Sequence, residues 1–205
     1  MSESIAHHDE HRDDEASKLG IWLFIFTELL FFGGLFVTYA VYRHAHPQAF
    51  HLAAQQLDVT VGTINTVILL ISSMTIAMAT TSIQKKNKRA TLILIGITLF
   101  LALVFLVNKY FEWGVKFDHG IWPGSPLLEE LGRGDTLFFA LYFFMTGLHA
   151  LHIIIGIVLI TVIYVRVQKG KITFDNFQLL ENGGLYWHLV DLIWIFLFPL
   201  FYLIT

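Results

Sequence analysis

The sequence predicts an all-α protein that crosses a membrane as a bundle of five helices, and its composition is the first evidence. Of the 205 residues, 56% are hydrophobic and only 14% are charged, whereas a soluble domain carries roughly 25% charged residues. The mean hydropathy is +0.65. Because so little polar surface is available, much of the chain must face lipid. This excludes a soluble enzyme and a disordered chain.

Charge and cysteine content exclude further classes. The 13 lysines and arginines stand against 16 acidic residues, which leaves a net charge of −3. The chain therefore has no basic surface for a nucleic-acid backbone. It also contains no cysteine, which excludes disulfides, thiolate metal sites and cysteine nucleophiles.

Five apolar runs are long enough to cross a bilayer, which takes about 20 residues. They cover residues 19–42, 60–83, 90–113, 136–165 and 185–205. None alternates polar and apolar residues as a strand does, so each is expected to be a helix. Ahead of this transmembrane domain, residues 1–18 hold six acids and three histidines. We expect residues 1–18 to be an acidic, solvated tail.

The distribution of lysine and arginine predicts the orientation, because cytoplasmic loops carry the excess of these residues. Nine lie in the tail, in the loop between the second and third spans, and in the loop between the fourth and fifth. Four lie on the other side. We expect a cytoplasmic N-terminus and a C-terminus on the outer side.

The first span contains one ionisable residue near its middle, Glu28. It lies about 14 Å from the start of the span at Leu19, near the middle of the membrane, and its helical neighbours are phenylalanine and isoleucine. An ionisable group at this depth costs several kcal/mol. It is either a proton-linked carboxyl or a lipid-headgroup partner, or it is a neutral acid that hydrogen-bonds to a neighbouring helix.

The second span carries small hydroxyl residues. Thr66, Ser73, Ala77 and Thr80 share one helical face, and such faces are the usual contact surface between membrane helices. We expect this face to pack against another span.

The fourth and fifth spans contribute further polar candidates. His149 and His152 lie in the fourth span, and His188 and Asp191 lie in the fifth. Both pairs have the i, i+3 spacing that can build a metal site in a bundle. The two pairs differ in depth if the fifth helix starts at Leu185, although a start near Gln178 narrows the gap. We therefore favour a buried hydrogen-bonded network over a metal.

Three charged residues lie at the membrane edges. Glu112 is expected on the outer side, and Arg166 and Glu181 on the inner side. An arginine at a helix end can extend to a lipid phosphate, or it can be an ordinary positive-inside residue.

Several of these residues fall in segments that carry a family resemblance. The segments are residues 18–28 (KLGIWLFIFTE), Asn65-Thr66, Phe111-Glu112, residues 146–152 (TGLHALH) and residues 186–194 (YWHLVDLIW). In this order they resemble subunit III of the haem–copper terminal oxidases, cytochrome c oxidase in particular, in its short five-helix bacterial form.

The resemblance implies a non-catalytic subunit of a proton-pumping oxidoreductase that reduces oxygen to water in aerobic respiration. Haem and copper are then held by partner subunits, and this chain carries no redox centre, catalytic residue or metal. The implied partners are the catalytic haem–copper subunit I, a copper-bearing or quinol-type subunit II, and phospholipids of a bacterial inner (plasma) membrane.

The resemblance also assigns roles to single residues. Glu28 matches the intramembrane carboxyl of the family. Arg166 and Glu181, by their distances before Tyr186, match a lipid-anchoring arginine and an acid of a polar network. The resemblance thus favours Arg166, Glu28 and Glu181 as lipid-binding residues. Glu28, Glu112, His149, His152, His188 and Asp191 are the expected intramembrane polar or proton-linked set.

Three alternatives remain at this point. The chain could be the five-helix subunit III of a quinol oxidase, although the intramembrane glutamate is often absent there. It could be a related helper of nitric oxide reductase. From a different class, it could be a self-contained membrane metalloenzyme that uses His149, His152, His188 and Asp191.

Overall fold

The chain is helical almost throughout. The computed structural model describes the backbone of residues 2–204 and the side chains of residues 15–128 and 130–204. Within these residues it has seven α-helices and no β-strand. The helices are α1 (Ser2–Ala45), α2 (Pro47–Ala54), α3 (Val59–Gln84), α4 (Lys88–Asp118), α5 (Pro126–Leu131), α6 (Arg133–Gln168) and α7 (Gln178–Tyr202). The all-α prediction is confirmed.

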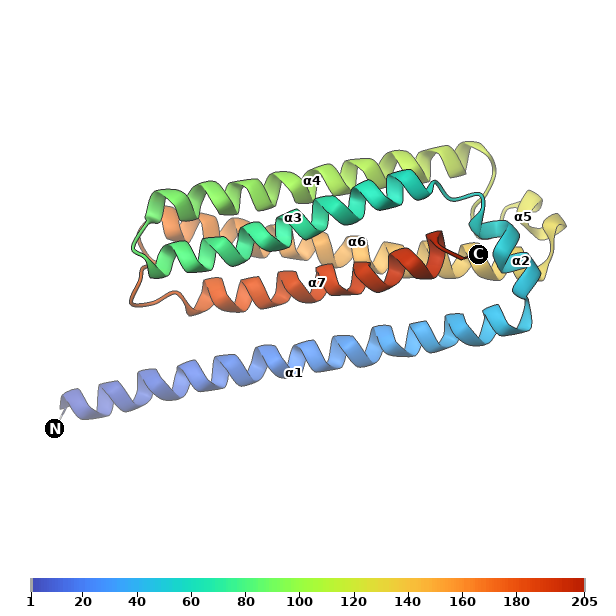
Figure 1. Ribbon diagram of the computed structural model, residues 1–205. Coiled ribbons are helices and arrows are strands. Elements are labelled where there is room, and N and C mark those ends of the chain that lie inside the picture. The colour runs from blue at the N-terminus through green and yellow to red at the C-terminus, as the bar shows by residue number, and fades with distance from the viewer. Residues whose placement is uncertain (1, 205) are drawn as a thin grey trace.

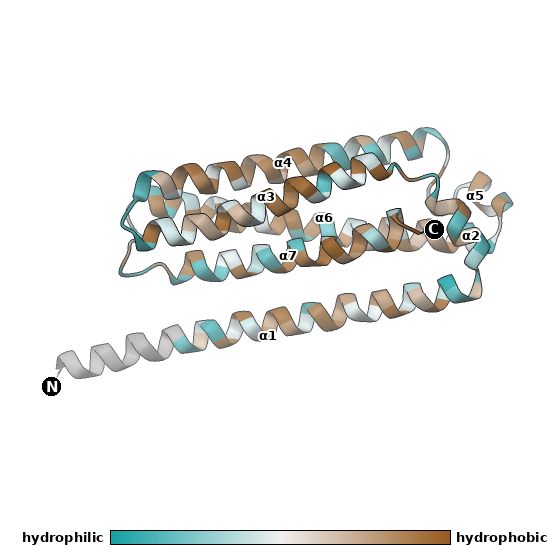
Figure 2. Cartoon of the chain, viewed as in Figure 1, coloured by the Kyte–Doolittle hydropathy of each residue, from teal (hydrophilic) through white to brown (hydrophobic). Residues whose placement is uncertain are grey.

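Five of these helices are long and apolar enough to cross a membrane. They are α3, α4, α6, α7 and the part of α1 from Glu15 onward. Hydrophobic residues fill their central turns, and hydrophilic residues gather at the turns that join α3 to α4 and α6 to α7 (Figure 2). The predicted five-span membrane bundle is therefore confirmed.

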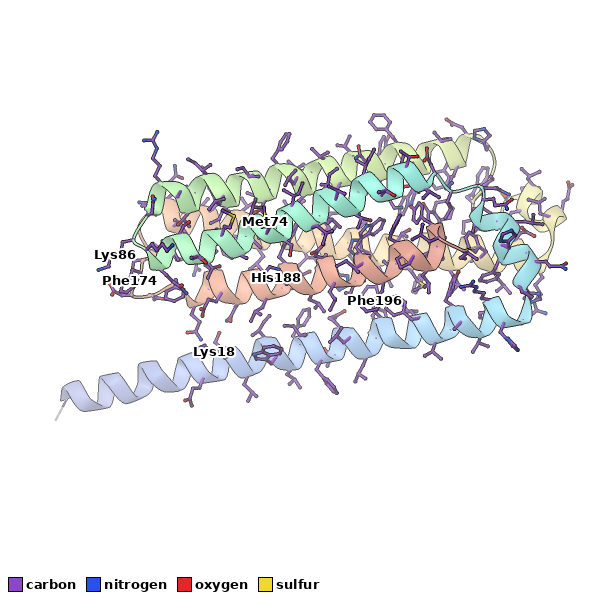
Figure 3. The ribbon with its side chains drawn as sticks, in the orientation of Figure 1. Lys18, Met74, Lys86, Phe174, His188 and Phe196 are labelled. Atoms are coloured by element: carbon purple, nitrogen blue, oxygen red, sulfur yellow. The ribbon has the colours of Figure 1, made fainter. Side chains whose placement is uncertain are left out.

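The five long helices are not equivalent in their packing. Helices α3, α4, α6 and α7 form a four-helix core, and α1 lies along its outside next to α7 (Figure 1). The short helices α2 and α5 lie at the end of the bundle that holds the C-terminus. The turns between α3 and α4 and between α6 and α7 lie together at the opposite end. There, the Lys86 ammonium sits 4.6 Å from the ring centre of Phe174 (Figure 3).

Two helices extend beyond the spans predicted from hydropathy. Helix α4 continues to Asp118 because Lys109, Glu112 and Lys116 share one helical face, which is buried against the bundle. Helix α7 begins at Gln178, ahead of the expected Leu185. Hydropathy marks neither extension, because polar residues and glycine interrupt the apolar ones in residues 114–118 (GVKFD) and 178–184 (QLLENGG), although both segments pack as helix.

The first helix begins at Ser2, upstream of the predicted first span. The side chains of residues 1–14 lie outside the described part of the chain. The acidic, solvated tail over residues 1–18 therefore stays a prediction.

The hydroxyl face of α3 packs on α7, as predicted. The indole Nε1 of Trp194 donates to the Thr66 hydroxyl at 3.0 Å, and Ser73 lies 2.7 Å from Nδ1 of His188. Small side chains bring the helices close, and their hydroxyl groups hydrogen-bond across the interface.

Helix α1 contacts the core through a narrow stripe. Ile25, Phe32 and Tyr39 are buried, one every seven residues, while most of the other side chains of α1 from Glu15 onward are exposed. The Tyr39 hydroxyl donates to the carbonyl oxygen of Leu200 at 2.5 Å. Because α7 ends at Tyr202, this carbonyl lacks a partner within its own helix. Tyr39 thus caps α7 and fixes one end of α1.

Close contact between α6 and α7 requires glycine at two positions. A Cβ at Gly156 would lie 2.7 Å from the Trp187 ring, and a Cβ at Gly183 would lie 2.4 Å from Cδ1 of Ile163. Trp187 is fully buried, so its ring has little freedom to move. These glycines set the spacing of the two helices.

We expect Gly156→Ala to lower the free energy of unfolding by about 1–3 kcal/mol, the usual range for an overpacked core. Gly96→Ala is the control, since a Cβ there meets no atom within 4 Å and alanine favours the helix. Thermal unfolding midpoints in detergent measure both. Equal midpoints for the two variants would contradict this account of the α6–α7 contact.

Candidate functional site

Glu28 of α1 and His152 of α6 meet in the membrane-spanning part of the bundle. Oε2 of Glu28 lies 3.1 Å from Nε2 of His152, and Nδ1 of His152 lies 2.8 Å from the carbonyl oxygen of Leu148. Because a carbonyl oxygen only accepts, Nδ1 carries a hydrogen. The hydrogen bond between Nε2 and the carboxyl group therefore needs a further proton, which resides on one partner or the other.

Aromatic side chains enclose this pair. The Phe32 ring lies edge-on to the His152 ring, with centres 5.5 Å apart, and the Tyr186 hydroxyl donates to the carbonyl oxygen of His152 at 2.9 Å. Phe24 in turn stacks on Tyr186. The same patch of α1 thus supplies both the carboxyl group and its apolar surroundings. Chemically, the arrangement can hold one proton between two helices away from bulk water.

His149 lies one helical turn from His152 but has a different environment. Its side chain is fully buried, and its ring lies between Phe105 and Trp194, with centre distances of 5.6 Å and 5.2 Å. Neither ring nitrogen has a hydrogen-bond partner among the described residues. His149 is therefore a packed core histidine and not part of the Glu28–His152 pair.

His188 and Asp191 face α3 instead of α6. His188 bonds to Ser73 at 2.7 Å, and Asp191, also buried, interacts with the same hydroxyl. The neighbouring Ser72 accepts from Nε1 of Trp187 at 3.1 Å. These contacts form a polar seam between α3 and α7.

The four residues of the metalloenzyme alternative therefore occupy three separate environments. His152 pairs with Glu28, His149 is enclosed by aromatic rings, and His188 bonds to Ser73 of α3, with Asp191 beside the same hydroxyl. Across the described side chains, no three histidine, aspartate or glutamate residues come close enough to hold a metal ion. The early start of α7 at Gln178 narrows the depth gap between the two pairs, but it does not bring them together.

Glu112, which the sequence places at the outer edge and in the intramembrane polar set, bonds to three other side chains. Its Oε2 accepts from the Lys109 ammonium at 3.1 Å, and its Oε1 accepts from the Tyr142 and Tyr202 hydroxyls, each at 2.5 Å. Lys109 also donates to both tyrosines, at 3.1 Å and 2.6 Å. The four side chains, which we call the Glu112 network, join α4, α6 and α7.

Lys109 is a member of this buried site that the sequence does not predict. It had been counted among the outer charges, yet its side chain is 3% exposed. The available signal was the Lys109-x-x-Glu112 spacing, which places opposite charges on one face of a helix. Nothing in the sequence marks Tyr142 and Tyr202 as partners of this ion pair, because they lie 30 and 90 residues beyond Glu112.

Arg166 and Glu181 lie at the opposite end of the bundle but do not line one site together. Arg166 is exposed in the last turn of α6. Glu181 lines a cleft of about 400 Å³ together with Lys18, Trp22 and His188. This cleft lies between α1 and the α3–α7 pair, where Lys18 and His188 approach from different helices (Figure 3).

Comparison with known proteins places the chain in a family. A family model described as cytochrome c oxidase subunit III matches residues 2–205. "Cytochrome c oxidase subunit 3" of Thermostichus vulcanus is 33% identical over 98% of this chain and 93% of the relative. "Probable quinol oxidase subunit 3" of Staphylococcus saprophyticus is 31% identical over 96% of each protein.

A third relative is a longer protein. "Heme-copper oxidase subunit I+III" of Aeropyrum pernix is 32% identical over the whole of this chain, which spans 25% of that protein's length. The chain belongs to the cytochrome c oxidase subunit III family.

The Glu112 network yields a stability prediction. We expect Lys109→Met to lower the free energy of unfolding by about 3–5 kcal/mol, because the substitution leaves the buried Glu112 carboxylate without its counter-charge. The double variant Lys109→Met, Glu112→Gln removes both charges and should be the more stable of the two.

Thermal unfolding midpoints measure this difference, with Lys85→Met at an exposed lysine as the control. If the double variant were no more stable than the single one, the Lys109–Glu112 ion pair would not be what holds α4 in this position.

Proposed function

We propose that this chain, a multi-pass subunit III of the haem–copper oxidase family, supports proton uptake by the catalytic subunit through the Glu28–His152 pair. The pair is the observation that carries the proposal. It needs one shared proton, it lies within the spanning part of the bundle, and its carboxyl group comes from the outermost helix. A partner subunit that packs on α1 would lie next to it.

The proposed direct partner is the catalytic subunit I. The Aeropyrum relative, named as subunit I+III, supports this assignment, because its name joins the two subunits in one protein. The exposed apolar face of α1, with Trp22, Phe26 and Leu30, suits contact with further membrane helices. In this proposal, haem and copper are held by partner subunits, and the chain stabilises subunit I.

Cytochrome c is the proposed electron donor of the complex, through a copper-bearing subunit II. The Thermostichus relative is named for that activity, and Glu28 matches the carboxyl of the cytochrome c type. A quinol oxidase is the second candidate, which the Staphylococcus relative supports.

The proposed orientation places the N-terminus in the cytoplasm of a bacterial cell. The turns that carry Lys85, Lys86, Lys169 and Lys171 lie at one end of the bundle, and the short helices α2 and α5 lie at the other (Figure 1). Clustering of basic turns at one end supports a cytoplasmic position for that end.

Phospholipid binding is proposed at this cytoplasmic end, with Arg166 and Glu181 as the charged residues and Glu28 deeper in the membrane. Arg166 is exposed at the end of α6 and can extend to a lipid phosphate. The cleft beside Glu181 is open to Lys18 and Trp22 of α1, and an amphipathic aromatic ring such as that of Trp22 suits the membrane interface.

Glu28→Gln tests the proton role. Glutamine keeps the size and a hydrogen bond to His152, but it cannot take part in proton transfer. In the complex purified in mild detergent, which is expected to contain a haem-bearing subunit and to oxidise cytochrome c, we expect a normal initial rate that declines over successive turnovers. The decline should steepen at higher pH, where protons are scarce.

His152→Gln removes the other half of the pair and should give the same decline with the subunits still assembled. Oxygen consumption under prolonged turnover, with subunit content checked afterwards, measures both variants. If oxygen consumption by both variants were sustained as long as that of the wild-type complex, Glu28 and His152 would have a packing role only.

Arg166→Ala is expected to release phospholipid that otherwise co-purifies with the complex, because the side chain supplies the charge that holds a phosphate. Lys169→Ala, a nearby exposed cation, is the control and should keep the lipid. Lipid mass spectrometry of the purified complexes measures the difference. Equal lipid content in the two variants would show that Arg166 is an ordinary positive-inside residue.

A further inference from the structure

A second polar cleft lies at the α2 end of the bundle, far from Arg166 and Glu181. It has a volume of about 440 Å³ and lies where the start of α3 meets the end of α4. Its polar lining consists of Gln56, Asp58, Asn108, Glu112 and Lys116. The cleft therefore borders the Glu112 network.

The depth of this cleft matches the headgroup layer of a bilayer. Helix α4 begins with Lys88 and Arg89, and a hydrocarbon core of about 30 Å takes roughly 20 helical residues. Counted from Arg89, the core would end near Lys109. Lys116 then lies about 40 Å from Arg89, within a bilayer of about 40–45 Å that includes both headgroup layers.

Lys116 has donors to spare in this cleft. Its side chain is buried, and its ammonium donates to the carbonyl oxygen of Gln56 at 3.2 Å. An ammonium group carries three donors. The hydrogen bonds of Glu112 go to Lys109, Tyr142 and Tyr202, so Glu112 and Asp58 act on Lys116 through their charge, and N–H donors of Lys116 remain for a further acceptor.

Asp58 supplies the opposite charge on the same cleft. One carboxylate oxygen, Oδ1, caps α3 by accepting from the backbone N–H groups of Thr60 and Val61, at 2.8 Å and 3.2 Å. Its other oxygen takes no part in the cap. The side chain is exposed, so a cation can reach it.

The remaining walls are apolar. Ile64, Phe111 and Val115 line the cleft, and each is about half exposed or more. An inorganic ion would gain nothing from such walls, whereas an acyl chain would bury against them. The cleft thus pairs a cation and an anion at headgroup depth with an apolar surface that leads toward the hydrocarbon.

We propose that this cleft binds a phospholipid whose headgroup carries both a phosphate and a primary ammonium, as phosphatidylethanolamine does. The phosphate accepts hydrogen bonds from Lys116, and the ammonium donates to Asp58. One acyl chain lies along Ile64 and Phe111. The site is independent of the lipid binding proposed for Arg166 and Glu181, because it lies in the opposite leaflet.

For the test, the complex is reconstituted in vesicles of phosphatidylcholine mixed with either phosphatidylethanolamine or phosphatidylglycerol. It is then extracted in mild detergent, and the lipids that it retains are compared. Native mass spectrometry counts the bound lipids. We expect the wild-type complex to retain phosphatidylethanolamine over phosphatidylcholine, whose methylated ammonium cannot donate. Asp58→Asn should reduce this preference about fivefold, the effect of one partly exposed ion pair, and asparagine still caps the helix.

Lys116→Met should reduce the retention of both phosphatidylethanolamine and phosphatidylglycerol. Arg166→Ala should leave phosphatidylethanolamine bound at this site. A failure of the site proposed here can therefore be told apart from a failure of the lipid binding proposed for Arg166 and Glu181. Equal retention of phosphatidylethanolamine by wild type and Asp58→Asn would overturn the ammonium assignment, and equal retention by Lys116→Met would overturn the site. Displacement of the lipid by inorganic phosphate alone would show an anion site without lipid specificity, and would also overturn it.

Discussion

A polar side chain on a membrane helix costs free energy unless it finds a partner within the protein, because lipid offers none. This constraint governs each interface of the bundle. The α3–α7 contact is held by Ser73 with His188, and α1 meets α6 through Glu28 and His152. Helices α4, α6 and α7 converge on the buried ion pair of Lys109 and Glu112. Other hydroxyl groups, such as those of Thr27, Thr38 and Thr161, bond to a carbonyl oxygen of their own helix instead.

The constraint also explains why α1 differs from the other spans. It lies beside the core with one buried stripe and polar contacts that include Ser17 with Asn182, Glu28 with His152, and Tyr39 with the end of α7. Most of its other described side chains are exposed, and the exposed ones between Leu19 and Tyr42 are mainly apolar. The proposed proton-linked role depends on this placement, because the Glu28 carboxyl group belongs to the outermost helix and is paired with His152 of the core.

The two ends of the bundle differ in whether their charged side chains are buried or exposed. At the α2 end, Lys109 and Lys116 are drawn inward to Glu112 and Gln56, so that charge is buried and α4 extends beyond the apolar run. At the opposite end the lysines and arginines stay exposed on short turns. Buried charge leaves a shaped polar cleft at one end, and exposed charge leaves a basic surface at the other.

The amino-acid sequence by itself determined the class, the five spans, the family and most of the polar residues, because hydropathy and local motifs are properties of neighbouring residues. Only the tertiary structure decided which side chain each polar residue contacts. His149 and His152 are three residues apart, yet one is enclosed by aromatic rings and the other meets Glu28 on a distant helix. Lys109 was misjudged for the same reason: its burial depends on Tyr142 and Tyr202, which only the packing of α6 and α7 brings beside it.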